Sequence, residues 1–337
     1  MRQITGIILS ILLLAGCSSH RLSQGRAFSL SRVSFSDLPG WTDDDLNDAY
    51  PALERACTKP AKEWQSFCNG LSDYKYASSR KLRRYLERTL IPYRVTAYGN
   101  KTGWITGYYE SELTGSRYQT SSEQIPIYGA PAGYAQDKKY PVREDIESDG
   151  LDAPIVAWAD DPVDLFLMHV QGSGRMETLD GEIHLGFAGS NNRTFTGIGQ
   201  ILKEEGLLEE VGHSMVQIRA WLKAHPDRAR QLMAQNDRYI FFREIQGETP
   251  IGTAGVPLTP GHSVAVDKAY IPMQTPMWLV TTDPEGEPIR TLVVAQDTGS
   301  AIKGGIRADY FFGHGEKAFS SAGRMNTSGS YYLLLPD

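Results

Sequence analysis

Short apolar segments separated by glycine and proline turns recur from Gly103 to the end of the chain. Such segments are typical of barrels, whereas a parallel doubly wound sheet needs long helices between its strands. Apolar residues recur at helical spacing over residues 43–93 and again over residues 195–235. Pro92 is expected to end the first helical block. We therefore expect a mainly β chain with helices. The strand candidates are residues 154–158, 163–171, 181–187, 264–266, 277–280, 292–295 and 331–335.

The first twenty residues carry the pattern of a bacterial secretory signal. Arg2 precedes an apolar stretch over 7–15, which is too short to cross a bilayer as a helix. The stretch ends in Leu-Leu-Ala-Gly-Cys, which resembles the lipobox of bacterial lipoproteins and implies lipid attachment to Cys17. An incidental cysteine after an ordinary secretory signal is the alternative. We expect a signal peptide over 1–16 and a lipid anchor with a linker over 17–42.

The lipobox resemblance has consequences for the compartment. Ser18 follows the lipidated cysteine, which by resemblance to lipoprotein sorting favours the outer membrane, facing the periplasm. In that oxidising compartment the pair Cys57 and Cys68 predicts a disulfide, with two buried free thiols as the alternative. Neither cysteine lies near a Cys or His cluster, so we expect no metal and no cofactor. The net charge of −6 gives no basic footprint for nucleic acid.

One acidic residue lies in a segment that suits sugar chemistry. Asp309 is followed by Tyr310, Phe311 and Phe312 and then by two glycines within three residues. A carboxyl group among aromatic rings is poorly solvated, which raises its pKa and keeps it protonated near neutral pH. A general acid for a glycosidic oxygen requires that property. The alternative is that Asp309 caps a helix beginning at Tyr310, with the aromatic rings in a core.

A second aspartate, Asp297, follows the apolar segment 292–295 and begins an Asp-Thr-Gly sequence. Aspartic proteases use this sequence, but two aspartates must share one proton, so a single chain should carry it twice. It occurs once here. Serine catalysis lacks a Gly-x-Ser-x-Gly turn, and the histidines lack a metal-binding spacing. A protease is therefore the weaker interpretation.

Several motifs occur in order along the chain. They are Thr-Gly-Tyr-Tyr-Glu (106–110), Gln-Gly-Ser-Gly-Arg (171–175), Asn-Arg-Thr-Phe-Thr-Gly-Ile-Gly (192–199), Asn-Asp-Arg-Tyr-Ile-Phe-Phe (236–242) and the segment 297–313 around Asp309. Together they resemble the membrane-bound lytic transglycosylase A family (MltA), over about residues 95–335. Ser300 and Phe195 depart from many relatives, which have Gly and Tyr there.

The resemblance implies a two-domain fold that is mainly β with α. One domain is a double-psi β-barrel with an N-terminal helical segment, over 43–104 and 241–337. The other is a smaller β-barrel domain inserted over 105–240. A deep groove lies between the two. The chain is long enough for both domains once the signal is removed.

The resemblance also implies an activity, that of a peptidoglycan exotransglycosylase, a lyase. Such an enzyme cleaves the β-1,4 bond between N-acetylmuramic acid and N-acetylglucosamine and leaves 1,6-anhydromuramic acid ends. Asp309 is then the single acid/base, and Asp297 and Asp267 are either supporting acids or turn residues. The candidate substrate-binding residues, for which barrel packing or a surface ion pair is the alternative, are Thr106, Tyr108, Tyr109, Gln171, Lys303 and Arg307.

Two rival functions remain on the same barrel. A non-catalytic glycan-binding protein would release no product, and a hydrolytic glycosidase would release reducing ends and need a second carboxylate. The expected partners are peptidoglycan glycan strands and, through the lipid, the outer membrane. An enzyme tethered there also makes cell-wall synthase or scaffold proteins plausible partners.

Overall fold

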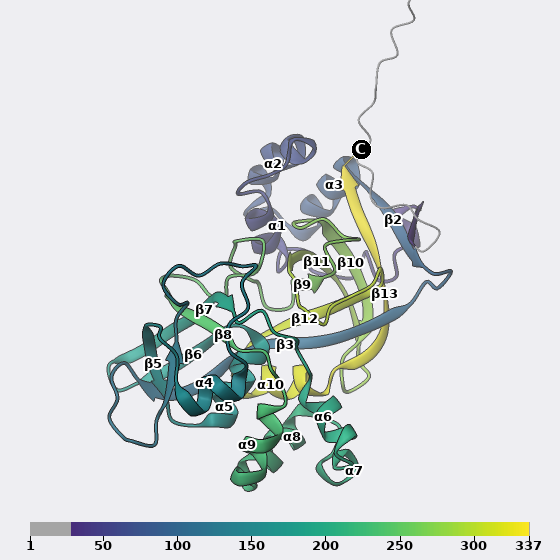
Figure 1. Ribbon diagram of the computed structural model, residues 1–337. Helices are drawn as coiled ribbons and strands as arrows, with labels where there is room; N and C mark the ends of the chain where they lie inside the picture. The colour runs from purple at the N-terminus through teal and green to yellow at the C-terminus, as the bar shows by residue number, and fades with distance from the viewer. Residues whose placement is uncertain (1–27, 337) are drawn as a thin grey trace, which may run out of the picture.

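The computed structural model describes residues 28–336. The expected signal peptide and the expected lipidation site, Cys17, lie outside this range. Two β-rich bodies lie side by side and are joined by one long strand (Figure 1). Between residues 28 and 336 there is no helix with the length and apolarity needed to span a membrane.

The larger body is a closed β-barrel. Its strands and the two that flank it are β1 (Phe28–Arg32), β2 (Leu90–Ala97), β3 (Gly103–Ser116), β9 (Ser263–Val266), β10 (Pro276–Thr282), β11 (Pro288–Asp297), β12 (Arg307–His314) and β13 (Asn326–Pro336). Pairing runs β3-β12-β9-β11-β10-β13, and β13 pairs back with β3 to close the ring. The β3–β12 and β9–β11 pairs are parallel, so these strands are joined by crossover connections and not by hairpins.

The second body is built on the continuation of β3. Its other strands are β4 (Ile125–Tyr128), β5 (Ile155–Ala159), β6 (Gly174–Thr178), β7 (Gly181–Ser190) and β8 (Ile240–Ile245). From Ser111 onward β3 pairs with β6, and its last residues pair with β5. The strands surround a separate buried core that includes Leu113, Met176 and Phe242.

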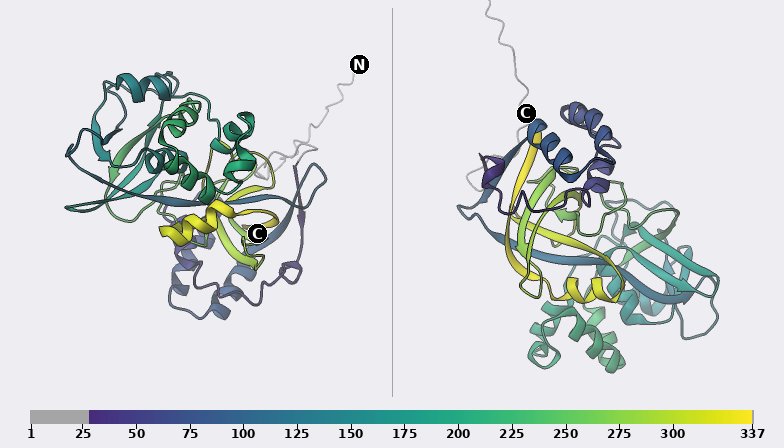
Figure 2. Two further views of the ribbon diagram at one scale, coloured as in Figure 1. Left: turned by 90° about the horizontal axis from the view of Figure 1, so that it is seen from below. Right: turned by 180° about the vertical axis from the view of Figure 1, so that it is seen from behind.

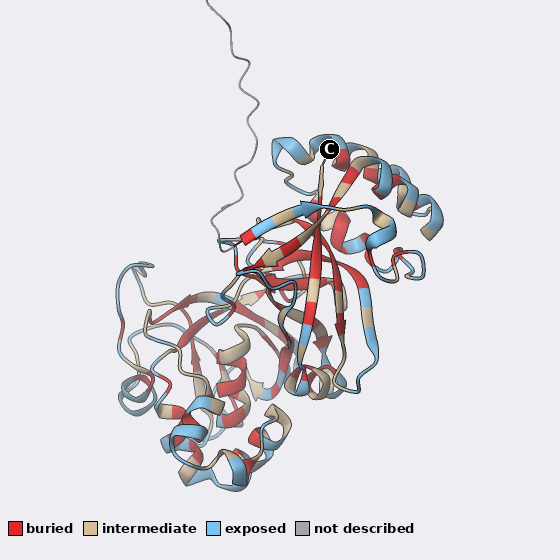
Figure 3. Ribbon diagram, turned by 90° about the vertical axis from the view of Figure 1, so that its right-hand side faces the viewer, coloured by how far each residue is buried: buried red, intermediate tan, exposed pale blue. Residues whose placement is uncertain are grey.

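Helices cover both bodies. They are α1 (Tyr50–Ala56), α2 (Gln65–Leu71), α3 (Ser79–Thr89), α4 (Arg143–Asp149), α5 (Pro162–Gln171), α6 (Ile198–Glu204), α7 (Leu208–Val211), α8 (Met215–Ala224), α9 (Pro226–Ala234) and α10 (Gly315–Arg324), with short 3-10 turns at Phe35–Asp37, Lys62–Trp64 and Ser72–Tyr74. The N-terminal helices share a buried cluster with the barrel through Leu53, Leu86 and Trp278. Helix α10 lies at the junction of the two bodies, where Phe319 packs with α6, α8 and α9 (Figure 2). Buried residues run along the strands of both bodies and the inner faces of the helices (Figure 3).

One predicted strand is a helix. Residues 163–171 form most of α5, because the Asp161 side chain accepts hydrogen bonds from the amides of Val163 and Asp164, and Pro162 occupies the first helical turn. The helix is buried on most sides, so its apolar residues run continuously and their spacing does not distinguish it from a buried strand.

Three predicted boundaries also move. Residues 28–42, assigned to the linker, belong to the fold, since β1 pairs with β2 and Trp41 is buried. The N-terminal helical block ends at Thr89 and not at Pro92, which lies inside β2. The expected limits of the insertion, 105 and 240, fall within β3 and at the start of β8, and β8 still pairs with β7.

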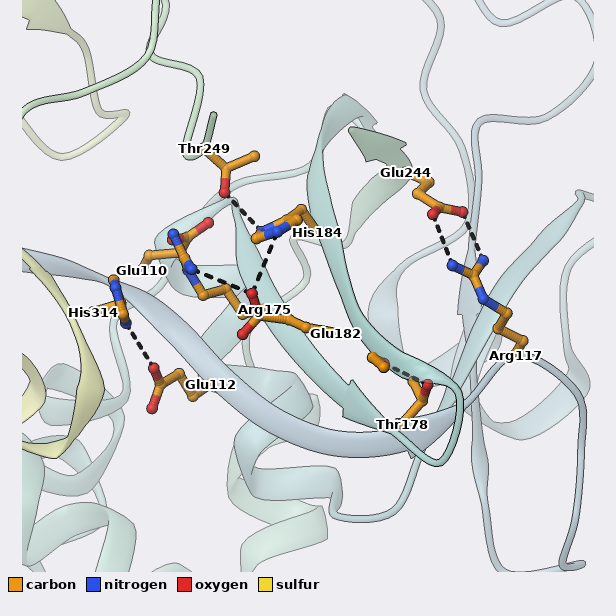
Figure 4. A network of polar contacts seen from close by, with 11 residues as sticks. Glu110, Glu112, Arg117, Arg175, Thr178, Glu182, His184, Glu244, Thr249 and His314 are labelled. Carbon is orange, nitrogen blue, oxygen red and sulfur yellow. Dashed lines mark hydrogen bonds and ion pairs between the residues drawn. The ribbon is translucent and has the colours of Figure 1, made fainter. Parts of the chain in front are cut away.

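A line of polar contacts connects the two chain segments that pass between the bodies (Figure 4). Arg175 Nε donates to Oε2 of Glu110 on β3 at 2.6 Å, and Arg175 Nη1 lies 3.3 Å from Glu182 Oε1. His184 Nε2 lies 3.3 Å from the same oxygen, and His184 Nδ1 lies 2.8 Å from Oγ1 of Thr249, in the segment that returns to the barrel. The contacts therefore link the outgoing strand to the returning segment.

Cys57 and Cys68 form a disulfide between the end of α1 and the middle of α2. The bond closes a loop with a sequence separation of 11 residues. A cross-link of that span removes conformational entropy from the unfolded chain.

Replacing both cysteines by alanine should lower the free energy of unfolding by about 3 kcal/mol, the loop-entropy value for this span. Urea unfolding of both proteins, followed by circular dichroism, measures the difference. Dithiothreitol should shift the midpoint of the wild type and leave that of the double variant unchanged. Equal midpoints for the two proteins without reductant would contradict a stabilising role for the bond.

Candidate active site

A cleft of about 800 Å³ lies between the barrel and the second body. Residues of both bodies line it, and the connection from β11 to β12 forms part of its wall. The lining residues used below are Tyr108, Gln171, Phe187, Arg238, Arg243, Ala265, Lys268, Asp297, Lys303 and Asp309.

Asp309 is the third residue of β12 and pairs with Thr106 of β3 on one side and Ala265 of β9 on the other. One carboxylate oxygen, Oδ1, accepts a hydrogen bond from Arg307 Nη1 at 2.6 Å and another from the Thr106 hydroxyl. Arg307 Nη2 also donates to Thr106 Oγ1 at 2.9 Å, which completes a triangle of contacts. Within residues 28–336 the other oxygen, Oδ2, has no hydrogen-bond partner. Asp309 is thus held by one oxygen while the other stays available to a ligand.

The surroundings of Asp309 differ from the sequence interpretation in two ways. The residue lies within a strand, so it does not cap a helix. Side chains alternate across a strand, so Tyr310 and Phe312 lie on the opposite face, with ring centroids 5.0 Å apart. The groups in contact with the Asp309 carboxylate are Arg307 and Thr106. Of the three aromatic residues, Phe311 therefore lies on the face of Asp309, where it packs against Tyr108.

Tyr108 lies two residues after Thr106 on the same face of β3 and lines the cleft. Its ring packs 5.1 Å from that of Phe311. Burial raises the pKa of the Tyr108 phenol well above its usual value, and the nearby carboxylates of Asp297 and Asp309 raise it further. The hydroxyl is buried and therefore stays protonated at neutral pH.

Asp297 ends β11 and also lines the cleft. Its Oδ1 accepts three hydrogen bonds, from Thr253 N at 2.9 Å, Thr253 Oγ1 at 2.8 Å and Thr298 N at 2.9 Å. Burial raises the pKa of this carboxyl, and the hydrogen bonds from Thr253 and Thr298 oppose that rise. The contacts tie the end of β11 to the neighbouring loop at Thr253.

Asp267 follows β9 and is buried, and it is not among the residues that line the cleft. Its two oxygens accept backbone hydrogen bonds, Oδ1 from Ala269 N at 3.1 Å and Oδ2 from Gly304 N at 2.9 Å. Gly304 belongs to the connection between β11 and β12, and its neighbour Lys303 lines the cleft. Asp267 therefore fixes a loop of the cleft wall, and its oxygens are occupied.

Two candidate residues of the second body behave differently. Gln171 ends α5 and lines the cleft, and its Oε1 accepts a hydrogen bond from the Tyr109 amide at 3.3 Å. The Tyr109 side chain is buried and packs against Phe319 of α10, with ring centroids 5.3 Å apart. The prediction that Tyr109 lines the groove is wrong, because successive side chains of a strand point to opposite faces.

The cleft carries positive charge that the sequence analysis missed, apart from Lys303. Arg238 and Arg243 come from the second body, and Lys268 and Lys303 come from the barrel. No acidic residue between 28 and 336 forms an ion pair with any of the four. Arg238 lies within the motif 236–242 and Arg243 follows it, but the sequence does not show that they meet Lys268 and Lys303 across a cleft. Among the described residues no group of Asp, Glu, His or Cys is arranged to hold a metal ion.

Comparisons with known proteins agree with this architecture. The family model of the MltA specific insert domain matches residues 104–243, and that of the 3D domain matches residues 262–335. A membrane-bound lytic murein transglycosylase A homolog of Buchnera aphidicola is 32% identical over 270 residues, which cover 77% of this chain and 73% of that protein.

Solved structures show the same fold. MltA from Neisseria gonorrhoeae has a TM-score of 0.83 and 32% identity, and the match covers 93% of this chain and 94% of that one. Escherichia coli MltA with bound chitohexaose has a TM-score of 0.74 and 26% identity, with coverage of 92% and 94%. The predicted fold class, a double-psi barrel with an inserted β-rich domain, is thereby confirmed. Family models for both bodies and a relative of this identity and coverage show that the chain belongs to the MltA family of lytic murein transglycosylases.

Proposed function

We propose that this chain is a peptidoglycan lytic transglycosylase in which Asp309 is the single acid/base. It cleaves the β-1,4 bond between N-acetylmuramic acid and N-acetylglucosamine and leaves 1,6-anhydromuramic acid ends. The observation that carries the proposal is the geometry of Asp309, whose Oδ1 is held by Arg307 and Thr106 while Oδ2 stays unpartnered in the cleft. Membership of the MltA family supports the reaction class.

The reaction proceeds in two proton transfers through one carboxyl group. Protonated Asp309 donates from Oδ2 to the glycosidic oxygen, and the bond to C1 of muramic acid breaks through an oxocarbenium-like state. The C6 hydroxyl of the same sugar then attacks C1 and gives its proton back to Asp309. Because the nucleophile is intramolecular, its effective molarity is high, and no second carboxylate is required to activate water.

The neighbours of Asp309 have separate roles in this proposal. Arg307 and Thr106 fix the plane of the carboxyl group, and the guanidinium stabilises the carboxylate that remains after the first proton transfer. The Tyr108 ring, which lines the cleft, contacts the substrate, while its buried hydroxyl stays beside Asp297. Asp267 accepts hydrogen bonds from the amides of Ala269 and Gly304, and Asp297 accepts one from the amide of Thr253. We therefore assign both acids a structural role.

The positive cleft indicates a substrate with carboxylates. Peptidoglycan carries them on the lactyl group of muramic acid and on its peptide stems, whereas chitin-type oligosaccharides are neutral. Each wall of the cleft offers cations, Arg238 and Arg243 on one side and Lys268 and Lys303 on the other. We therefore propose that Lys303 contacts substrate carboxylates, whereas Arg307, which does not line the cleft, holds Asp309.

Asp309→Asn should abolish product formation from purified sacculi, a loss of about a hundredfold or more, because the amide cannot exchange the proton. Mass spectrometry of the released sugars should show anhydromuropeptides from the wild type and from Asp152→Asn, a control at an exposed position. Reducing-end products from the wild type would instead identify a hydrolase. No turnover by the wild type would favour a glycan-binding protein.

Lys303→Ala should raise KM about threefold for peptide-bearing glycan and leave kcat near the wild-type value, as expected for a partly exposed charge pair. A second substrate is glycan from which an amidase has removed the peptide stems. If Lys303 binds the stem carboxylates, the difference in KM between Lys303→Ala and the wild type should be smaller on this substrate. Lys317→Ala, at an exposed position of α10, is the matched control. An equal loss on both substrates would rule out recognition of the stem carboxylates.

We further propose that lipid on Cys17 anchors the enzyme to the outer membrane, facing the periplasm, and that cell-wall synthase or scaffold proteins are partners there. The similarity to the Buchnera relative, a membrane-bound lytic murein transglycosylase A homolog, supports membrane association. In fractionated cells, Cys17→Ser should move the protein from the membrane fraction to the soluble periplasm. Retention of the variant in the outer-membrane fraction would exclude this anchor.

The proposed protein partners need a separate test. A pull-down with the lipidated enzyme that recovers no cell-wall synthase or scaffold protein would count against them.

A further inference from the structure

A large aromatic side chain is exposed close to Asp309. Trp104, near the start of β3, is 61% exposed. A single exposed aromatic side chain is ordinary at a protein surface, so the position of Trp104 beside the catalytic groups is what carries the inference. The cleft mechanism above does not use this residue, since Trp104 is not among the residues that line the cleft.

The strand register places Trp104 on the same face as the catalytic groups. Side chains alternate along β3, so Trp104, Thr106 and Tyr108 share one face, while Ile105 points into the barrel core. Contacts confirm this orientation, because Thr106 hydrogen-bonds Asp309 and the Tyr108 ring packs against Phe311. Two residues along a strand span about 7 Å, a distance comparable with one sugar unit.

Polar side chains flank the indole on both sides. On β13, Ser328 is paired with Trp104 and Asn326 with Thr106, and both residues are exposed. Directly opposed residues of antiparallel strands project to the same face, so these two side chains lie beside the indole. On β12, Arg307 is the register partner of Trp104. The resulting surface, formed by Trp104, Asn326 and Ser328, is called the Trp104 shelf below.

We propose that the Trp104 shelf is a sugar-binding subsite that continues the cleft beyond Asp309. The apolar face of a pyranose ring stacks on the indole, and Asn326 and Ser328 hydrogen-bond its hydroxyl or N-acetyl groups. This inference rests on the proposed function, since it extends the binding path of the same glycan strand by one unit. The shelf itself binds neutral sugar, whereas the cations of the cleft recognise carboxylates.

The composition of the shelf favours a sugar over a protein partner. Protein-binding hot spots centre on an aromatic residue surrounded by contacts that exclude water. The register partners of Trp104, however, are Ser328 and Arg307, and Asn326 is the partner of Thr106 on the same face. The hydroxyl of Ser328 and the amide of Asn326 are able to hydrogen-bond sugar hydroxyls. The shelf also adjoins Asp309 on the same sheet face, which a glycan strand held in the cleft must pass.

The test measures binding of chitohexaose, a neutral probe, in the Asp309→Asn background so that no turnover interferes. Trp104→Ala should weaken binding about tenfold, and Trp104→Phe should weaken it less because a smaller ring remains. Tyr76→Ala removes an aromatic residue that is 94% exposed near the N-terminal helices and should leave the affinity unchanged. Chitohexaose should also shift the tryptophan fluorescence of the parent protein, and this shift should be absent from Trp104→Phe.

Three outcomes separate the shelf from the proposed function. Weaker binding by the Trp104 variants, with normal binding by Tyr76→Ala and loss of the fluorescence shift, supports the shelf. Equal affinity of all variants overturns the shelf, while anhydro products from the wild-type enzyme would leave the proposed function standing. Failure of every variant and of the parent to bind chitohexaose would overturn the shelf and, if sacculi are also not degraded, the proposed function as well.

Discussion

The pairing of β3 on both of its edges is the constraint on which the rest of the structure depends. Its first half closes the barrel between β12 and β13, and its second half is the strand on which the other body is built. A strand has two faces, so the same segment sends Ile105 into the barrel core and Thr106 and Tyr108 toward the cleft. One rigid strand therefore fixes both walls of the cleft relative to Asp309.

Hydrogen bonding separates three aspartates that look alike in sequence. Asp267 and Asp297 accept backbone amides and a hydroxyl, and they hold the loop ends around the β11–β12 connection. Asp309 and Asp297 each accept their hydrogen bonds through one oxygen, whereas both oxygens of Asp267 are engaged. A carboxylate whose oxygens are engaged in structure is a poor proton donor. Asp267 is thereby set apart from the other two, and Asp309 differs from Asp297 by the guanidinium of Arg307 beside its carboxylate.

The secondary structure was predictable where local pattern and tertiary setting agree. The barrel segments 264–266, 292–295 and 331–335 are strands, and the helices over 198–234 follow their apolar spacing. Prediction failed at α5, because burial on most sides removed the periodicity that distinguishes a helix from a strand. It also failed at residues 28–42, where a polar composition hides the pairing of β1 with β2, a contact that spans more than 60 residues.

The sequence by itself determined the β-rich class, the family through its ordered motifs and the aspartate in the last of them. These features are local, since each depends on residues a few positions apart. The tertiary structure alone decided that Arg307 and Thr106 hold Asp309, although Thr106 lies 203 positions away from it. It also decided that Tyr109 turns into a core and that cations from both bodies meet in one cleft. The physical reason is that strand register, which sets the face of every side chain, arises from pairing between distant segments.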